Sequence, residues 1–304
     1  MEMARAGGKV ILLGEHAVVY GIPALAVGIE LGALASARLA EKSRIRLGET
    51  VTEVDAGTDV ARALAALLAE LGTPPLEIRV DLELPPGCGL GASAAIAVAV
   101  ARAALEASGS KAPESERVLG AAMAWERIFH GNPSGVDTAA AASGGCILFT
   151  RGEPPLNIEA KVSLRLAVAL AGPPASTKAM VEGVARIKQR RPELFEKSLE
   201  GIHSLVRNAR LCIEAGDTIG LGRLMDLNQM LLSGLFVSTE SIERACQLAR
   251  DAGALGAKLT GAGGGGAVVA LIGDDAEPVL EAWRGAGLPC FETVVRAARG
   301  VESR

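Results

Sequence analysis

Apolar and polar positions follow two different periods in the first half of the chain. Apolar residues recur at helical spacing from Thr58 to Gly72, and they alternate with polar residues from Leu76 to Leu84. The first pattern predicts a helix that Gly72 ends, and the second predicts a strand. Further helices are expected from Ser93 to about Ala107 and from Ser115 to His130. Shorter apolar runs predict strands over residues 9–13, 24–27 and 36–47.

A polar, turn-rich stretch from Arg151 to Pro155 indicates a domain boundary. We therefore expect one domain over residues 1–155 and a second over residues 156–304. In the second half the pattern predicts a strand over 164–170, a largely helical stretch over 177–252, a strand-like stretch over 258–272, a helix, and a last strand over 290–295. Strands and helices mix without a strict β-α-β rhythm, which favours an α+β fold.

The composition of the chain argues against several classes of function. The 304 residues carry a net charge of -4 and only 3% aromatic side chains, so the chain is not expected to bind nucleic acid. No apolar run approaches the roughly 18 residues of a membrane span, and the N-terminus lacks the pattern of a signal peptide. Five scattered cysteines are typical of reduced thiols in a cytoplasmic protein. Three scattered histidines give no zinc-site spacing, so a metal would need oxygen ligands.

The segment from Pro85 to Ala95 carries the strongest chemical signal. A predicted strand runs into three alternate glycines, Gly87, Gly89 and Gly91, and then into a predicted helix. Glycines let the backbone approach a ligand, and a helix N-terminus offers free N–H groups, so this segment is predicted to bind phosphate. No Lys-Ser/Thr pair closes the segment, which distinguishes it from the common P-loop. Ser93 is either a Mg²⁺ ligand or the N-cap of the helix.

A second glycine-rich segment, from Thr260 to Gly266, formally matches the dinucleotide-binding pattern G-x-G-x-x-G. The apolar run that follows it, from Ala267 to Ile272, predicts a strand and not the helix that such a site needs. Two interpretations stay open on these residues: a loop that closes over a ligand, or a long hairpin turn.

Two acidic residues, Glu126 and Asp137, flank a Gly-Asn-Pro-Ser-Gly turn. Such a turn can direct both carboxylates to one site, where one holds a metal ion and the other contacts a substrate hydroxyl. The alternatives are a surface position for Glu126 and an N-cap role for Asp137. Taken alone, Lys9 is typical of a solvated residue at a strand end, and His16 of a structural histidine.

Several segments together resemble the GHMP small-molecule kinases and, within them, the mevalonate kinases. The first runs from Gly8 to Ala26 and includes Glu-His-Ala-Val-Val, the second is the Pro85–Ala95 segment, and the third runs from Lys258 to Gly266. The segments 130–137, 176–181 and 228–232 are similar to mevalonate kinases specifically. The chain differs from the usual sequence motifs at Gly7 and Ala92. Over residues 235–239 its sequence is Leu-Phe-Val-Ser-Thr, where mevalonate kinases typically have Leu-Gly-Val-Ser-His.

The resemblance implies a two-domain α+β GHMP kinase fold, with an N-terminal domain like domain 2 of ribosomal protein S5 and a ferredoxin-like C-terminal domain, and with the active site between them. It implies ATP and Mg²⁺ as cofactors, with Ser93 and Glu126 as metal ligands. It also implies that ATP is bound by Pro86, Gly87, Cys88, Gly89, Leu90, Gly91, Ala92, Ser93, Gly263 and Gly264.

The same resemblance implies mevalonate as the substrate and 5-phosphomevalonate as the product, in a cytoplasmic homodimer of isoprenoid biosynthesis. Asp137 and Lys9 would be catalytic, and Glu15, His16 and Thr177 would line the substrate pocket. A carboxylate is a weak base, so Asp137 is expected to orient the hydroxyl and to take its proton late in the transfer. The alternatives are a GHMP kinase for another small alcohol and a non-catalytic nucleotide-binding regulator; a nicotinamide-dependent oxidoreductase is disfavoured by the strand after Gly266.

Overall fold

The computed structural model describes residues 3–85, 88–110, 115–131, 133–173 and 175–297. The chain forms two compact units. The first unit contains residues 1–9, 28–86 and 91–144, and the second contains residues 10–27, 87–90 and 145–304. The chain therefore passes between the units more than once, within strands β1 (Ala4–Leu13) and β2 (Ala24–Leu39) and at both ends of residues 87–90. The expected domain boundary near residue 155 stays a prediction.

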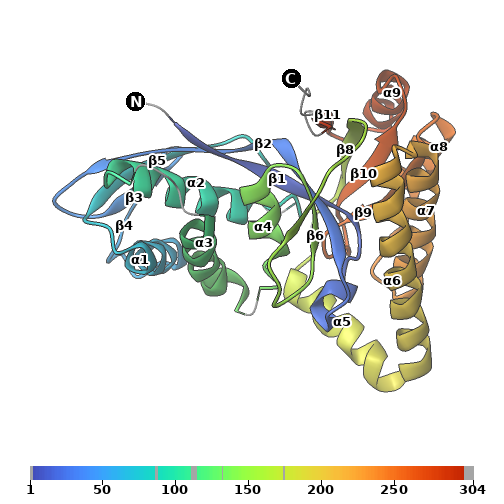
Figure 1. Cartoon of the computed structure of the whole chain (residues 1–304), viewed down its shortest axis with the longest axis horizontal. Coiled ribbons are helices and arrows are strands. Elements are labelled where there is room, and N and C mark those ends of the chain that lie inside the picture. Colours follow the sequence, from blue (N-terminus) through green and yellow to red (C-terminus); the bar gives the residue numbers. More distant parts are fainter. Residues whose placement is uncertain (1–2, 86–87, 111–114, 132, 174, 298–304) are drawn as a thin grey trace, which may run out of the picture. The chain divides into compact units, whose positions relative to one another are not determined.

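In the first unit, helices pack on a sheet (Figure 1). Strand β5 (Leu76–Leu82) pairs with β2 in antiparallel fashion and with β3 (Arg44–Leu47) in parallel, and β4 (Thr50–Glu53) pairs with β3. The helices are α1 (Asp59–Leu71), α2 (Ala92–Ala107), α3 (Ser115–His130) and α4 (Val136–Ser143). One apolar core joins β5 to α1, α2 and α3, and small alanines of α2 let the neighbouring helices approach closely.

The second unit contains an antiparallel sheet of β8 (Leu164–Gly172), β9 (Gly256–Thr260), β10 (Gly266–Ile272) and β11 (Cys290–Val295), in the order β11-β8-β10-β9. Helices α7 (Thr218–Gly234), α8 (Glu240–Asp251) and α9 (Glu277–Gly285) contact this sheet, while α5 (Thr177–Arg190) packs on α6 (Pro192–Ala215) and α6 on α7. With its helices between β8 and β9 and between β10 and β11, the sheet has the order of a ferredoxin-like fold. The first part of β2 pairs with β6 (Cys146–Phe149), and β6 with β7 (Leu156–Ile158).

The predicted helices are confirmed, because their signals are local. Helix α1 begins after Thr58, whose side chain accepts a hydrogen bond from the Ala61 N–H, and it ends at Gly72 in the left-handed conformation. The strand predictions were less complete. The single strand expected over 36–47 is the end of β2 followed by β3, and the stretch 258–272 is a hairpin of two strands. No helix in the described part of the chain has the length and apolar character needed to cross a membrane.

Candidate active site

In the first unit, a buried lysine lies beside a partly exposed carboxylate. Lys9 Nζ is 3.2 Å from Asp137 Oδ1, and the two side chains are 3% and 38% exposed, respectively. Asp137 lies in the first turn of α4, where its charge is favourable for the helix dipole. The N-cap of α4 is Gly135, so the interpretation of Asp137 as an N-cap is wrong, and so is that of Lys9 as a solvated residue. The pair offers a fixed cation next to an acceptor that a ligand can reach.

The N-terminus of α2 begins directly against this lysine. Gly91 is the N-cap residue with φ 76°, and a Cβ at this position would lie 2.8 Å from Lys9 Cγ. Glycine is therefore required here for both backbone conformation and space. No side chain of the described residues caps the helix, so the N-cap interpretation of Ser93 is wrong. Uncapped N–H groups beside a lysine fit the phosphates of a nucleotide.

Ser93 and Glu126 form a hydrogen-bonded pair in the same unit. The Ser93 hydroxyl donates to Glu126 Oε1, and Trp125 Nε1 donates to Ser93 Oγ over 3.3 Å. Glu126 Oε2 lies 3.6 Å from Nε2 of His130 at the end of α3. Burial raises the pKa of Glu126, which the hydrogen bond from Ser93 partly opposes. Glu126 is thus not the surface residue of the alternative interpretation, and the pair supplies the oxygen donors that Mg²⁺ prefers.

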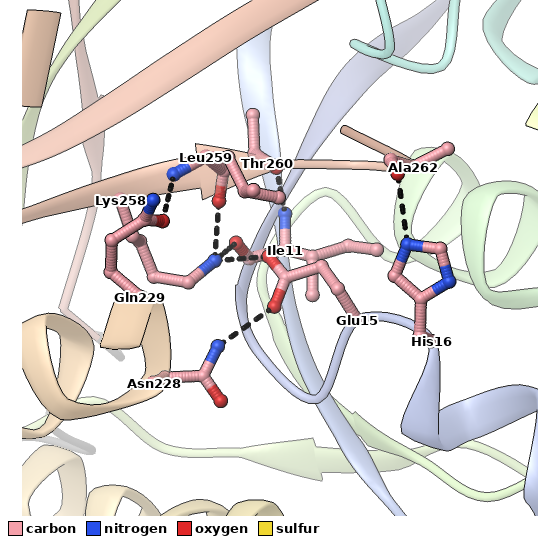
Figure 2. A network of polar contacts seen from close by, with 9 residues as sticks. All are labelled: Ile11, Glu15, His16, Asn228, Gln229, Lys258, Leu259, Thr260 and Ala262. Atoms are coloured by element: carbon pink, nitrogen blue, oxygen red, sulfur yellow. Dashed lines mark hydrogen bonds and ion pairs between the residues drawn. The ribbon is translucent and has the colours of Figure 1, made fainter. Parts of the chain in front are cut away.

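In the second unit, Glu15 and His16 belong to a buried polar network (Figure 2). The side chains of Glu15 and Lys258 form an ion pair and are both 0% exposed, and Asn228 Nδ2 donates to Glu15 Oε2 over 3.2 Å. His16 Nε2 lies 2.8 Å from the carbonyl oxygen of Ala262. Burial lowers the pKa of His16 from its ordinary value, and the contact with Ala262 partly opposes this. This lowered pKa favours the neutral imidazole of His16 at pH 7.

The Thr260–Gly266 segment is the turn of the β9–β10 hairpin, and whether this turn also closes over a ligand stays a prediction. Gly263 has φ 75°, and a Cβ there would lie 2.2 Å from the carbonyl oxygen of Val237. The Gly264 N–H donates to the same oxygen over 2.7 Å. A Cβ at Gly89 would lie 3.4 Å from the carbonyl oxygen of Thr260, so Gly89, which belongs to the same unit, lies close to this turn.

Comparison with known proteins decides the family. The model described as GHMP kinases N terminal domain matches residues 58–145, and that of the GHMP kinases C terminal matches residues 208–288. The mevalonate kinase of Thermococcus sibiricus is 34% identical over an alignment that covers 99% of this chain and 98% of that protein. The chain belongs to the GHMP kinase family. The mevalonate kinase of Aeropyrum pernix is 36% identical, with 88% of each chain covered.

A solved structure extends the likeness of this GHMP kinase to three dimensions. The L. major mevalonate kinase, solved in complex with R-mevalonate, has a TM-score of 0.86 and is 30% identical, covering 99% of this chain and 97% of that one. The expected two-domain α+β GHMP kinase fold is thereby confirmed. Membership of the family also makes the chain an ATP-dependent small-molecule kinase.

The remaining predicted site residues of this kinase lie as follows. Cys88 and Leu90 are buried, and Ala92 is the first residue of α2. Thr177 is exposed in the first turn of α5, in the second unit together with Glu15 and His16. Pro86 and Gly87 lie outside the described residues. The predicted residues thus form one set in each unit, and their roles stay predictions.

Sequence reasoning assigned no role to Lys258 or Asn228, although both lie in segments that carry the resemblance. A signal was available for Lys258, the single charged residue of the otherwise apolar or small strand Gly256–Thr260. A charge in a fully buried strand must have a partner. That partner, Glu15, comes from a distant segment, and only the fold reveals it.

Phe236, which stands where mevalonate kinases typically have glycine, is expected to lower the stability of the fold. Phe236 has φ 56°, a conformation that favours glycine, and its side chain is 67% exposed. Phe236→Gly should therefore raise the free energy of unfolding by about 1 kcal/mol, because it removes the backbone strain and little buried surface. Urea unfolding measures this difference. Phe236→Ala, which removes the ring and keeps the strain, is the matched control; an equal gain in both variants would contradict the strain argument.

Proposed function

We propose that this GHMP kinase transfers the γ-phosphoryl group of ATP to the 5-hydroxyl of mevalonate, giving 5-phosphomevalonate for isoprenoid biosynthesis. The observation that carries the proposal is the pairing of buried Lys9 with accessible Asp137, in a chain 34% identical over nearly its whole length to a mevalonate kinase. The L. major relative, whose structure holds R-mevalonate, supports the same substrate.

The first unit supplies groups for each part of phosphoryl transfer. The uncapped N-terminus of α2 and the Lys9 ammonium would neutralise charge on the transferring phosphoryl group. Asp137 would accept a hydrogen bond from the substrate hydroxyl and align its oxygen with the γ-phosphorus. As the new O–P bond forms and the bond to the ADP oxygen breaks, the hydroxyl proton moves to Asp137 and then to water. Because a carboxylate is a weak base, the proton moves late, when bond formation has made it acidic.

Ser93 and Glu126 would hold the Mg²⁺ ion that accompanies ATP. Their donor atoms are a hydroxyl and a carboxylate, a normal protein complement for an ion that keeps several waters. When bound, Mg²⁺ neutralises phosphate charge. The raised pKa of Glu126 reflects an unfavourable buried carboxylate, which a cation would compensate.

In the second unit, His16 and Thr177 would contact the substrate, and Gly263 and Gly264 would contact the nucleotide. A cytoplasmic homodimer is proposed on the family resemblance alone. The neutral state of His16 means that it would bind substrate through hydrogen bonds and not as a cation.

The test is ADP release from MgATP with a panel of acceptors: mevalonate, 5-phosphomevalonate and galactose. We expect turnover with mevalonate and little with the other two, and the product should be identified as 5-phosphomevalonate by mass spectrometry. Turnover with another acceptor only would replace the substrate and keep the kinase. Binding of ATP without turnover of any acceptor would favour the non-catalytic regulator.

A further inference from the structure

In the second unit, the charged groups of the buried ion pair between Lys258 and Glu15 have several hydrogen-bond partners. The Lys258 ammonium has three donors, and it contacts Glu15 Oε1 and the carbonyl oxygens of Leu259 and Ile11. The other carboxylate oxygen of Glu15 accepts from Asn228. Both charged side chains are 0% exposed, and Lys258 and Asn228 together hold the two carboxylate oxygens of Glu15.

The residue that follows Glu15 is held in an unusual backbone conformation. His16 has φ 60° and ψ −44°, and the Ala17 N–H donates to the Glu15 carbonyl oxygen over 2.7 Å. These values describe the rare γ-turn with positive φ, which is strained for a residue other than glycine. Such strain persists only where the surroundings over-determine the conformation, and it concentrates at functional sites.

This turn follows strand β1, and several hydrogen bonds join residues 11–16 to the β9–β10 hairpin (Figure 2). The Ile11 N–H donates to Thr260 Oγ1 over 2.9 Å, Lys258 pairs with Glu15, and His16 contacts the Ala262 carbonyl oxygen. Because that oxygen can only accept, His16 Nε2 carries the proton and Nδ1 is left as an acceptor. The contacts on either side of His16 thus fix both the direction of its ring and its tautomer.

We propose that Lys258 and Asn228 are positioning residues: by holding Glu15, they keep the strained turn at His16 in place and so orient the imidazole toward the substrate. Stability alone is a poor explanation for this network, because well-packed apolar residues usually replace a buried ion pair without loss of stability. The proposal rests on the proposed function for the identity of the substrate. It also moves Glu15 from the predicted substrate-contacting set to the residues that act through His16.

The decisive variant is the double exchange Glu15→Gln with Lys258→Met, which removes both charges together and leaves none unpaired. We expect it to fold, to raise KM for mevalonate about tenfold, and to leave kcat within about threefold of wild type, as expected for lost substrate binding. The matched control is Arg165→Met with Glu292→Gln, which removes a partly exposed ion pair between β8 and β11 in the same unit. It should leave both constants unchanged.

A second readout does not depend on turnover. The chain has three histidines, so ¹⁵N-histidine NMR resolves the ring of His16 from those of His130 and His203. In wild type we expect a neutral Nε2–H tautomer for His16, and in the double variant a displaced signal that no longer shows this hydrogen bond. Asn228→Ala, which keeps the ion pair and removes one contact of Glu15, should move both readouts in the same direction by a smaller amount. It also serves as the test variant if the double variant does not fold.

The outcomes separate this inference from the proposed function. If the His16 signal and KM match wild type while the melting temperature falls, the network serves stability only and the inference is wrong. A displaced His16 signal with unchanged KM would overturn the link to substrate. If wild type does not phosphorylate mevalonate, the proposed function fails, whereas the NMR signal still decides whether Lys258 and Asn228 position His16.

Discussion

Asp137→Asn is expected to lower kcat by about a thousandfold, the middle of the range for a lost proton acceptor. Asparagine keeps the size of the side chain and its place in the first turn of α4, but it cannot take the hydroxyl proton. Lys9 keeps its position against Gly91, so KM for ATP should change little. Steady-state kinetics with mevalonate and MgATP measure both constants. Transfer of ³²P from γ-labelled ATP to mevalonate gives the residual rate where steady-state turnover is too slow to follow.

The matched control for this variant is Glu83→Gln. Glu83 pairs with Arg5 at 2.9 Å in the same unit and is 32% exposed, close to the 38% of Asp137. Both variants lose a partly exposed ion pair, so both should lose some stability, and only Asp137→Asn should lose activity. A fall in kcat of less than about tenfold would mean that Asp137 orients the hydroxyl without accepting its proton.

Features whose signals lie within one short segment could be predicted from the sequence. Features that depend on contacts between distant segments required the structure. Helix α1 was predictable because its cap at Thr58, its apolar stripe and its stop at Gly72 all lie within one short segment. Strand β3 was not separated from β2, since it is defined by pairing with a distant partner: Ile45 lies opposite Ile78. Short strands have no local signal of comparable strength.

The site residues divide in a similar way. The glycine pattern around Gly91 pointed to a phosphate loop from spacing and physical chemistry alone. Lys9 was identified only through the family resemblance, because burying a lysine depends on a carboxylate that the chain supplies much later, at Asp137. Whether Ser93 and Asp137 cap helices could be decided only by the structure, in which Gly91 and Gly135 occupy the cap positions.

Glu15 and His16 are adjacent in the motif, but their side chains have different partners in the structure. The motif placed Glu15 and His16 together in the substrate pocket, as neighbours in sequence. The structure separates their contacts: Glu15 pairs with Lys258, and His16 reaches the glycine hairpin at Ala262. A motif records which residues occur together, and the partners of each side chain decide whether it contacts the ligand or holds another residue that does.

Glu126→Gln is expected to abolish most of the MgATP-dependent activity and, at the same time, to stabilise the ligand-free protein. Burial raises the pKa of Glu126 above the ordinary value, so the native state favours the protonated carboxyl. Because the folded-state pKa lies above the unfolded one, protonation of Glu126 stabilises the native state. This contribution to the free energy of unfolding is fully present below about pH 4.5 and is lost as the pH rises through the folded-state pKa. At neutral pH wild type therefore carries the cost of a buried charge, which the amide of glutamine removes.

Thermal unfolding at several pH values, with and without MgATP, tests this reasoning. Without ligand, the melting temperature of Glu126→Gln should exceed that of wild type at pH 7, and the difference should disappear as the pH approaches 4.5. With MgATP the order should reverse, because the native state of wild type gains binding energy that the variant lacks. Glu116→Gln, an exposed position near the start of the same helix, should change neither curve. A lower melting temperature for ligand-free Glu126→Gln at pH 7 would show that the hydrogen bond from Ser93 and the attraction of Lys9 outweigh burial, so that the charged carboxylate is stable before the metal binds.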